Sequence, residues 1–420
     1  MQYIVYMIVI TLFFAAITYF KSKSFFRPNV IFSLIWIVGS IFLYINIGGI
    51  KNISNTTYMY IFLTVLSFNI GYLPFAEGER QKYDLETLRL IVDDKRYEKT
   101  LLWINFILVV ICFPYFIKML YIMITQSFYQ VRVAAYVYSG VYESIVSRVV
   151  FWPMFAFFNI VLMLCAIKLF LGVKDYRFYL LTVFDILYFS MITGSRNFIA
   201  KFFVYIVVAY ILGNFLLKKK RTIDFRIIAI GSLLAVILNA AIKARSLGML
   251  SPLENVVVYL FGGISFFDNI IKNTDVSMLY GRGMFGWVVS PILYLFSLTG
   301  IIPNCTAEYI IGDITKDGIY ISDDFNFNAL TTAMYPLFRD FGVLGIVLGM
   351  IMYGGIVMSS EKKMSEDFNV KNLMMFFSFL VTIFESTQYY DMIYIRFSLQ
   401  IFFIWFIFRK IKSTVVKIRT

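Results

Sequence analysis

Long uninterrupted runs of apolar residues recur along this chain of 420 residues, and they limit the folds open to it. Most runs are roughly 17–22 residues long, about the length that a helix needs to cross the hydrocarbon core of a bilayer. In hydrocarbon every backbone N–H and C=O must be satisfied within the protein, so continuous apolar runs indicate helices, whereas barrel strands would alternate apolar and polar residues. Hydrophobic residues make up 60% of the chain and charged residues only 15%. We therefore predict an all-α, polytopic integral membrane protein.

About eleven transmembrane helices are predicted, within a range of ten to twelve, in a single polytopic membrane domain that covers residues 1–420. Eight spans lie in 1–243, a large loop follows at 244–339, and three more spans lie in 340–420. The predicted spans are 2–20, 30–48, 58–76, 101–121, 149–170, 178–193, 198–217, 226–243, 340–358, 372–388 and 393–409.

The basic residues that flank these spans predict the orientation, because cytoplasmic loops retain lysine and arginine. Dense basic clusters follow the first, third, fifth, seventh and ninth spans and fill the C-terminal tail, for example Lys218 to Arg221. All of them fall on one side if the N-terminus is outside and the C-terminus is cytoplasmic. The net charge of +13 is then explained by topology and by contact with membrane lipids, and no nucleic-acid partner is expected.

The loop 244–339 is too long for a simple connection and is predicted to be extracytoplasmic. It holds two partly apolar stretches, 256–267 and 287–303, whose glycine and proline residues suit short re-entrant or amphipathic helices. A true span at 287–303 is the alternative, but it would place the basic C-terminal tail outside, so the re-entrant interpretation is preferred.

The absence of histidine excludes a Ser-His-Asp triad, a histidine-ligated metal and a histidine proton relay. No Gly-rich phosphate-binding loop follows a strand, so the chain does not read as a nucleotide hydrolase. We expect no metal site and no cofactor. Three cysteines do not form a framework, and no disulfide is expected.

Several cations gather on the predicted outer side, where lysine and arginine are normally sparse. They are Arg196, Lys243, Arg245, Arg282, Arg339 and Arg396. A guanidinium grips phosphate with two parallel hydrogen bonds, so the group predicts an anion site. The structural alternative is that these side chains contact lipid headgroups or pair with Asp340, Glu385 and Asp391.

Three motifs resemble those of the O-antigen polymerase family, the oligosaccharide repeat-unit polymerases. They are the turn Gly194-Ser195-Arg196, the loop segment YLFGGISFFDNI followed by YGRGMFG, and FNFNALTTAMYPLFRDFGVLG at Phe325–Gly345. The resemblance implies a membrane-embedded glycosyltransferase of the C type, which joins lipid-linked oligosaccharides on the outer face of the bacterial cytoplasmic membrane. It also implies a chain-length regulator and a flippase as working partners.

The resemblance assigns the outer arginines to the substrate, which maps onto Arg196, Arg282 and Arg339 by motif and onto Arg245 by location. A polyprenyl-diphosphate sugar is already activated, so such an enzyme must stabilise the leaving diphosphate and deprotonate an acceptor hydroxyl. Arg339 is expected at the start of the ninth helix, where the helix dipole also favours an anion. The candidate bases are Asp340, Glu385 and Asp391, although Asp340 could equally pair with Arg339 or cap the helix. Tyr280 and Tyr335, and also Tyr389 and Tyr390, are candidates for stacking on sugars, although an aromatic belt at the membrane interface accounts for most of the 30 tyrosines.

Two other functions fit the same composition. A lipid-linked oligosaccharide flippase would share the substrate, but transporters commonly consist of two related halves, and no such symmetry is visible here. An O-antigen ligase-type glycosyltransferase would have similar topology, but family resemblance predicts a histidine in its outer loop, and this chain has none.

The orientation can be tested by cysteine labelling in intact cells. A cysteine introduced between residues 77 and 99 should resist a membrane-impermeant thiol reagent, whereas Asp317→Cys should react, because the first segment is predicted inside and the second outside. Both changes belong in a background without Cys305, the only native cysteine predicted to face outward. The opposite pattern of labelling would reverse the topology.

Overall fold

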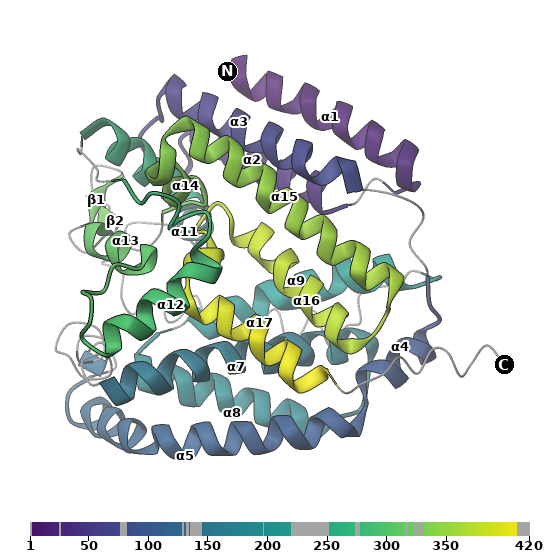
Figure 1. Ribbon diagram of the computed structural model, residues 1–420, viewed down its shortest axis with the longest axis vertical. Helices are drawn as coiled ribbons and strands as arrows, with labels where there is room; N and C mark the ends of the chain where they lie inside the picture. The colour runs from purple at the N-terminus through teal and green to yellow at the C-terminus, as the bar shows by residue number, and fades with distance from the viewer. Residues whose placement is uncertain are drawn as a thin grey trace. The chain divides into compact units, whose positions relative to one another are not determined.

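A computed structural model describes residues 2–24, 27–75, 82–127, 130–131, 134, 145–195, 197–219, 252–273, 278–315, 318–321, 326–327 and 331–409. This part of the chain is almost entirely helical (Figure 1). Its α-helices are α1 (Gln2–Ser22), α2 (Pro28–Tyr44), α3 (Asn55–Tyr72), α4 (Leu85–Val92), α5 (Lys95–Thr125), α7 (Ile145–Leu171), α8 (Tyr176–Thr193), α9 (Asn197–Leu216), α11 (Pro252–Asn273), α12 (Gly286–Leu298), α13 (Ala307–Thr315), α14 (Met334–Phe341), α15 (Val343–Glu366), α16 (Val370–Glu385) and α17 (Ile395–Phe408). Short 3-10 turns occupy η1 (Ile47–Gly49), η2 (Leu73–Phe75) and η3 (Asp391–Ile393), and the strands β1 (Ile319–Tyr320) and β2 (Asn326–Phe327) pair antiparallel.

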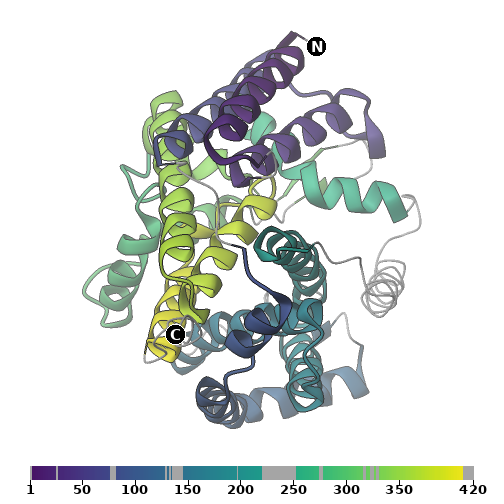
Figure 2. The same cartoon turned by 90° about the vertical axis from the view of Figure 1, so that its right-hand side faces the viewer.

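The helices form two compact units. Unit 1 comprises Met1–Arg80, Met249–Glu366 and Ser378–Ser398, and unit 2 comprises Gln81–Gly248, Asp367–Phe377 and Leu399–Thr420. In unit 1, α3 packs along α15 and also contacts α1 and α2 (Figure 1). In unit 2, α7 packs against α9, and α5, α7 and α8 lie side by side; Figure 2 shows several helices nearly end-on.

Five of the described helices, α1, α5, α7, α9 and α15, are long and apolar enough to cross a membrane. Ten of the eleven predicted spans coincide with a helix, and the remaining one, 226–243, lies outside the described residues. The helices α2, α12 and α17 are apolar but shorter. The fold is therefore that of a helical protein compatible with several passes through a membrane.

The exposed surfaces of α1 and α5 have the character of lipid-facing helices. On α5, large apolar side chains such as Trp103, Phe106 and Ile124 are more than half exposed, and Leu12 and Phe13 of α1 resemble them. A water-soluble protein rarely leaves such continuous apolar surface uncovered. Exposure of the same side chains to lipid carries no free-energy penalty, because lipid tails are equally apolar.

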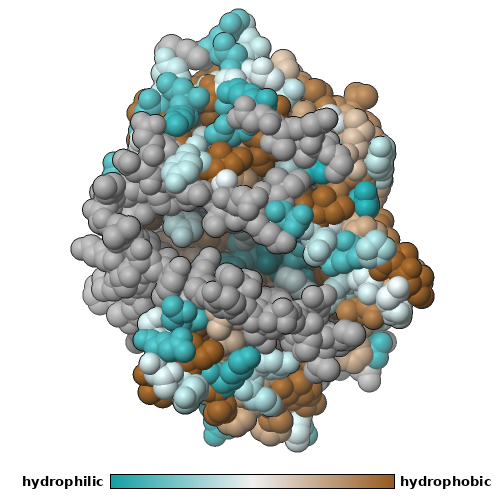
Figure 3. Space-filling view, turned by 90° about the vertical axis from the view of Figure 1, so that its left-hand side faces the viewer, coloured by the Kyte–Doolittle hydropathy of each residue, from teal (hydrophilic) through white to brown (hydrophobic). Residues whose placement is uncertain are grey.

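The predicted extracytoplasmic loop contains α11, α12, α13, the two strands and α14. The stretch 256–267 is helical within α11, and the stretch 287–303 is helical only as far as Leu298, where α12 ends. With 13 residues, α12 is about 20 Å long, less than the roughly 30 Å of a hydrocarbon core. Figure 3 shows patches of hydrophilic and hydrophobic side chains mixed on one face of the molecule.

The expected position of Arg339 at the start of the ninth helix is wrong. Arg339 lies in the last turn of the separate helix α14, which ends where Gly342 adopts a φ of +62°. The long helix α15 begins only at Val343. An L side chain rarely adopts that φ, so the glycine explains both the break and the loss of the expected helix-dipole contribution at Arg339.

Two glycines allow α3 and α15 to approach each other closely. A Cβ atom at Gly71 would lie 1.9 Å from the carbonyl oxygen of Ile351, and one at Gly354 would lie 2.2 Å from that of Phe68. Small residues at such positions let helix backbones meet, which is a common form of packing between membrane helices.

Substitution of either glycine should therefore weaken unit 1. Gly71→Ala and Gly354→Ala each force backbone atoms apart, at a cost of about 1–3 kcal/mol in unfolding free energy. The thermal unfolding midpoint of the purified protein in detergent measures this effect. Gly312→Ala is the matched control, because a Cβ at this helical position meets nothing within 4 Å and should be neutral or stabilising. Unchanged midpoints for both test variants would show that α3 and α15 are not in close contact.

Candidate functional site

The carboxylate of Asp340 is bound by the backbone of the YGRGMFG segment. Its Oδ1 accepts a hydrogen bond of 3.0 Å from Gly283 N, and its Oδ2 accepts one of 2.6 Å from Met284 N. The carbonyl of Arg339 accepts a further bond of 2.7 Å from Leu279 N. These contacts hold the end of α14 against a turn that lies far away in the sequence.

Glycine is required at the centre of this turn. A Cβ at Gly283 would lie 2.4 Å from the carbonyl oxygen of Pro336 and 2.9 Å from Asp340 Oδ2. Tyr280 and Gly281 both have positive φ, +50° and +85°. The glycines of YGRG thus let two adjacent amides converge on one carboxylate, an arrangement that only a tightly bent backbone provides.

Arg282 and Arg339 lie on the two segments that Asp340 joins. Arg282 donates from Nε to the carbonyl of Leu279 at 2.8 Å and from Nη1 to the carbonyl of Cys305 at 3.0 Å, so part of its guanidinium holds the loop together. Arg339 is buried and donates from Nη1 to the hydroxyl of Tyr335 at 3.0 Å.

A second charged group surrounds the connection between α16 and α17, and we call it the corner cluster: Glu308, Glu385, Asp391 and Arg396. Glu308 comes from the first turn of α13 and accepts a hydrogen bond of 3.3 Å from Ile395 N, at the start of α17. Arg396 Nη2 lies 3.8 Å from Asp391 Oδ1. The cluster thus joins four segments of unit 1.

Two tyrosines complete the corner cluster. The guanidinium of Arg396 lies over the ring of Tyr394, 4.0 Å from its centroid, and Tyr389 hydrogen-bonds to Glu385. All four charged groups lie within electrostatic range of Tyr394. Among the described residues, three carboxyl groups and one guanidinium therefore gather in a largely buried place.

Burial raises the pKa values of two carboxyl groups that lie outside the long helices, Glu308 and Asp340. Burial raises the pKa of Glu308 to about 7, although Arg396 and the amide of Ile395 oppose the shift. Burial also raises the pKa of Asp340, against the hydrogen bonds from Gly283 and Met284. Of the two, Glu308 is only partly buried and titrates near neutral pH, as a group that exchanges protons should.

The structure brings some of the predicted site residues together. Asp340, Arg282, Arg339 and Tyr335 are neighbours around the YGRG turn, and Glu385 and Asp391 share the corner cluster. Tyr280 is 72% exposed, whereas Tyr335 is fully buried and its hydroxyl accepts a hydrogen bond from Arg339. Arg196 and Arg245 lie outside the described residues.

Two carboxyl groups near or within the predicted spans were not selected by sequence reasoning. Glu308 lies in the long predicted loop, and nothing in the sequence indicates that it contacts the start of α17. Asp185 lies on α8 and is fully buried, with Oδ1 accepting a hydrogen bond of 3.0 Å from Asn105 on α5. A carboxyl in the middle of an apolar run is itself a signal, because such residues are costly in a membrane.

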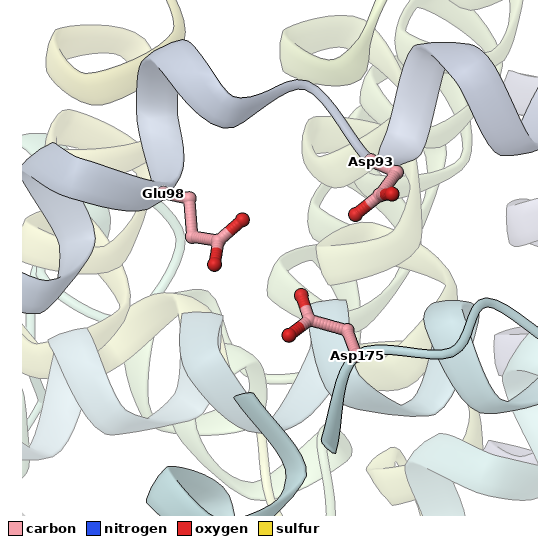
Figure 4. A group of neighbouring side chains, drawn as sticks. All are labelled: Asp93, Glu98 and Asp175. Carbon is pink, nitrogen blue, oxygen red and sulfur yellow. The ribbon is translucent and has the colours of Figure 1, made fainter. Parts of the chain in front are cut away.

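Three carboxylates of unit 2, Asp93, Glu98 and Asp175, converge closely enough to hold an ion (Figure 4). Two lysines already neutralise them. Lys168 is fully buried, bonds Asp175 and lies 3.3 Å from Asp93, while Lys95 Nζ lies 2.7 Å from Glu98. The group thus fastens the α4–α5 connection to the start of α8, and a cation would have to displace Lys168.

No family model, no curated protein and no solved structure matches this chain. The site is therefore interpreted from its own residues and from the motifs in the sequence.

Glu308 should make the stability of the protein depend on pH. A folded-state pKa near 7, raised from 4.5, means that the folded protein holds this proton more tightly than the unfolded chain does. The contribution is full below about pH 4.5 and is lost as the pH rises through about 7. Glu308→Gln should remove this fall, as measured by thermal midpoints across pH 4.5–8.

The matched control is Glu366→Gln, a carboxyl that is 62% exposed at the end of α15. It should leave the pH profile of the parent unchanged. If the parent and Glu308→Gln lose stability equally over this range, Glu308 is not held in the environment that the structure gives it.

Proposed function

We propose that this protein is a polymerase that joins polyprenyl-diphosphate-linked oligosaccharide repeat units into a surface polysaccharide such as an O-antigen, a capsule or an exopolysaccharide. In this proposal the chain crosses the bacterial cytoplasmic membrane eleven times, with its N-terminus outside, and acts on the outer face. The observation that carries the proposal is the gathering of arginines and carboxyl groups in unit 1. They come from the segments around 282, 308, 339 and 385–396, all predicted to be outside.

The two charged groups are connected through the backbone. Ser290 of α12 donates to the carbonyl of Ile393 at 3.1 Å, and Ala333 N donates to the carbonyl of Ser386 at 2.8 Å. The first bond ties the helix after the YGRG turn to the corner cluster, and the second ties the start of α14 to the end of α16. Arginines and carboxyl groups are thereby held on one scaffold, as glycosyl transfer requires.

The reaction needs a cation where negative charge develops. The acceptor oxygen forms a bond to the anomeric carbon of the donor sugar, and the bond from that carbon to the lipid diphosphate breaks. The diphosphate leaves with the electron pair, and Arg282, Arg339 and the predicted ligands Arg196 and Arg245 stabilise it.

The reaction also needs a base for the acceptor hydroxyl. Within the proposal, Glu308 takes this proton, because its pKa near 7 suits proton transfer at neutral pH. Glu385 and Asp391 remain candidates in the same cluster. Asp340 is assigned a positioning role, since both of its oxygens accept backbone hydrogen bonds.

Deletion of the gene tests the function directly through the lengths of the surface polysaccharide. A ladder that collapses to a single repeat unit supports the polymerase. Loss of all surface glycan would indicate a flippase, and complete polymer left on its lipid carrier would indicate a ligase. Turnover of lipid-linked repeats by the purified protein should survive EDTA, and a divalent ion that restores lost activity would reveal a metal site.

Arg339→Lys should lose much of the polymerising activity. Lysine keeps the charge but not the planar pair of donors that binds a phosphate oxygen pair. Loss of one such contact at the transition state should cost about 2–4 kcal/mol, or roughly 30- to 1,000-fold in rate. The measurement is the rate of polymerisation of lipid-linked repeats by purified protein.

Tyr335→Phe is the control, because it removes the hydroxyl that accepts from Arg339 but leaves the guanidinium in place. Tyr335→Phe should lower the rate of polymerisation much less than Arg339→Lys does. Thermal unfolding of both purified variants checks that each one is folded. Full activity of Arg339→Lys would show that Arg339 does not bind the diphosphate, and the site would then centre on Arg196, Arg245 and Arg282.

A further inference from the structure

Several buried hydroxyl groups in unit 1 have no hydrogen-bond partner among the described residues, and three of them belong to the segments where α14 begins and α16 ends: Thr332 Oγ1, Thr387 Oγ1 and the phenol of Tyr390. Their residues are 0%, 1% and 2% exposed. A buried hydroxyl has lost its water and normally gains a partner within the protein, so a group of such orphans calls for a specific explanation.

The three hydroxyls belong to one region. Thr332 and Thr387 flank the hydrogen bond from Ala333 N to the carbonyl of Ser386, which is 2.8 Å long. Tyr390 follows three residues after Thr387, and its ring meets that of Tyr353 edge-on, with centroids 5.6 Å apart. The region therefore lies where the start of α14 meets the end of α16.

This region also lies close to both charged groups. Burial raises the pKa of the Tyr390 phenol, and the nearby carboxylate of Asp340 raises it further. Glu385 precedes Thr387 by two residues, and Asp391 follows Tyr390 directly. Asp340 thus acts electrostatically on Tyr390, and two carboxyl residues of the corner cluster are close in sequence to Thr387 and Tyr390.

We propose that Thr332, Thr387 and Tyr390 line a subsite for a neutral sugar ring of the substrate. The inference rests on the proposed function, since it names the part of the lipid-linked oligosaccharide that this region recognises. Hydroxyl side chains both donate and accept hydrogen bonds, as the hydroxyls of a sugar do. Three of them, without a cation among them, complement a polyhydroxylated ring.

Other ligands fit this region less well. None of the three side chains carries the positive charge that a diphosphate would require, and the nearby carboxyl groups disfavour an anion. An isoprenoid chain would leave all three hydroxyls unsatisfied. Ordered water remains as the competing occupant, and the experiment separates it from a sugar.

The test compares two probes on the purified full-length protein in detergent. One is undecaprenyl diphosphate that carries the oligosaccharide repeat unit of the cell, and the other is undecaprenyl diphosphate alone. The parent should bind the glycosylated lipid more tightly. Thr332→Val, Thr387→Val and Tyr390→Phe should each weaken that binding about 3- to 10-fold, the effect of one lost neutral hydrogen bond, and leave binding of the bare lipid unchanged.

Thermal unfolding without ligand provides the second readout. The three variants remove groups that lack a partner, so their midpoints should equal or exceed that of the parent. The control is Thr382→Val, which removes a hydroxyl that bonds Tyr353 at 2.6 Å and Phe379 at 2.8 Å. It should lower the midpoint and leave the preference for the glycosylated lipid intact.

The outcomes separate this inference from the proposed function. A parent that prefers the glycosylated lipid but does not polymerise it would refute the polymerase and keep the subsite. A parent that polymerises while the three variants bind both lipids normally would refute the subsite. Lower midpoints for the three variants with unchanged binding would show that the hydroxyls hold structural water, and a parent without preference for the sugar would also overturn the proposal.

Discussion

The bond between the Asp340 carboxylate and two backbone amides is the interaction on which the candidate site depends. It joins α14 to a turn 57 residues earlier and sets the positions of Arg282 and Arg339 relative to each other. The amides of Gly283 and Met284 supply both donors, so the turn needs no cation to hold the carboxylate. Arg282 lies within electrostatic range of the same carboxylate, and Arg339 is the residue next to it in the chain.

Other buried charges in unit 1 also have partners on segments far apart in the chain. Arg27 at the start of α2 forms an ion pair of 3.3 Å with Glu361 near the end of α15, and Tyr72 of α3 donates to the same carboxylate. Asp268 accepts hydrogen bonds from Ser54 and Thr57 at the start of α3. A charge at such depth is tolerated only when it is paired, so each pair also specifies which helices meet.

The corner cluster differs from these pairs, because one of its carboxyl groups, Glu308, has a pKa raised to about 7 and can give or take a proton near neutral pH. Among the described residues the cluster holds three carboxyl groups and one guanidinium. Its position beside the Asp340 turn and the orphan hydroxyls brings a proton acceptor, cations and neutral polar groups into one unit. These are the parts that transfer of an activated sugar to a hydroxyl would use.

The sequence by itself determined the helical class and most helix positions, because hydrocarbon-length apolar runs leave the backbone one economical conformation. It also made Asp340, Arg282 and Arg339 candidates for a site, since charges in an apolar chain are few. It could not place the break at Gly342, which depends on a single backbone angle, and it put Arg339 on the wrong helix. Only the tertiary structure showed that Glu308 caps α17 and that Asp340 binds amides, because both contacts join residues more than 50 positions apart, and apolar periodicity carries no information about such pairs.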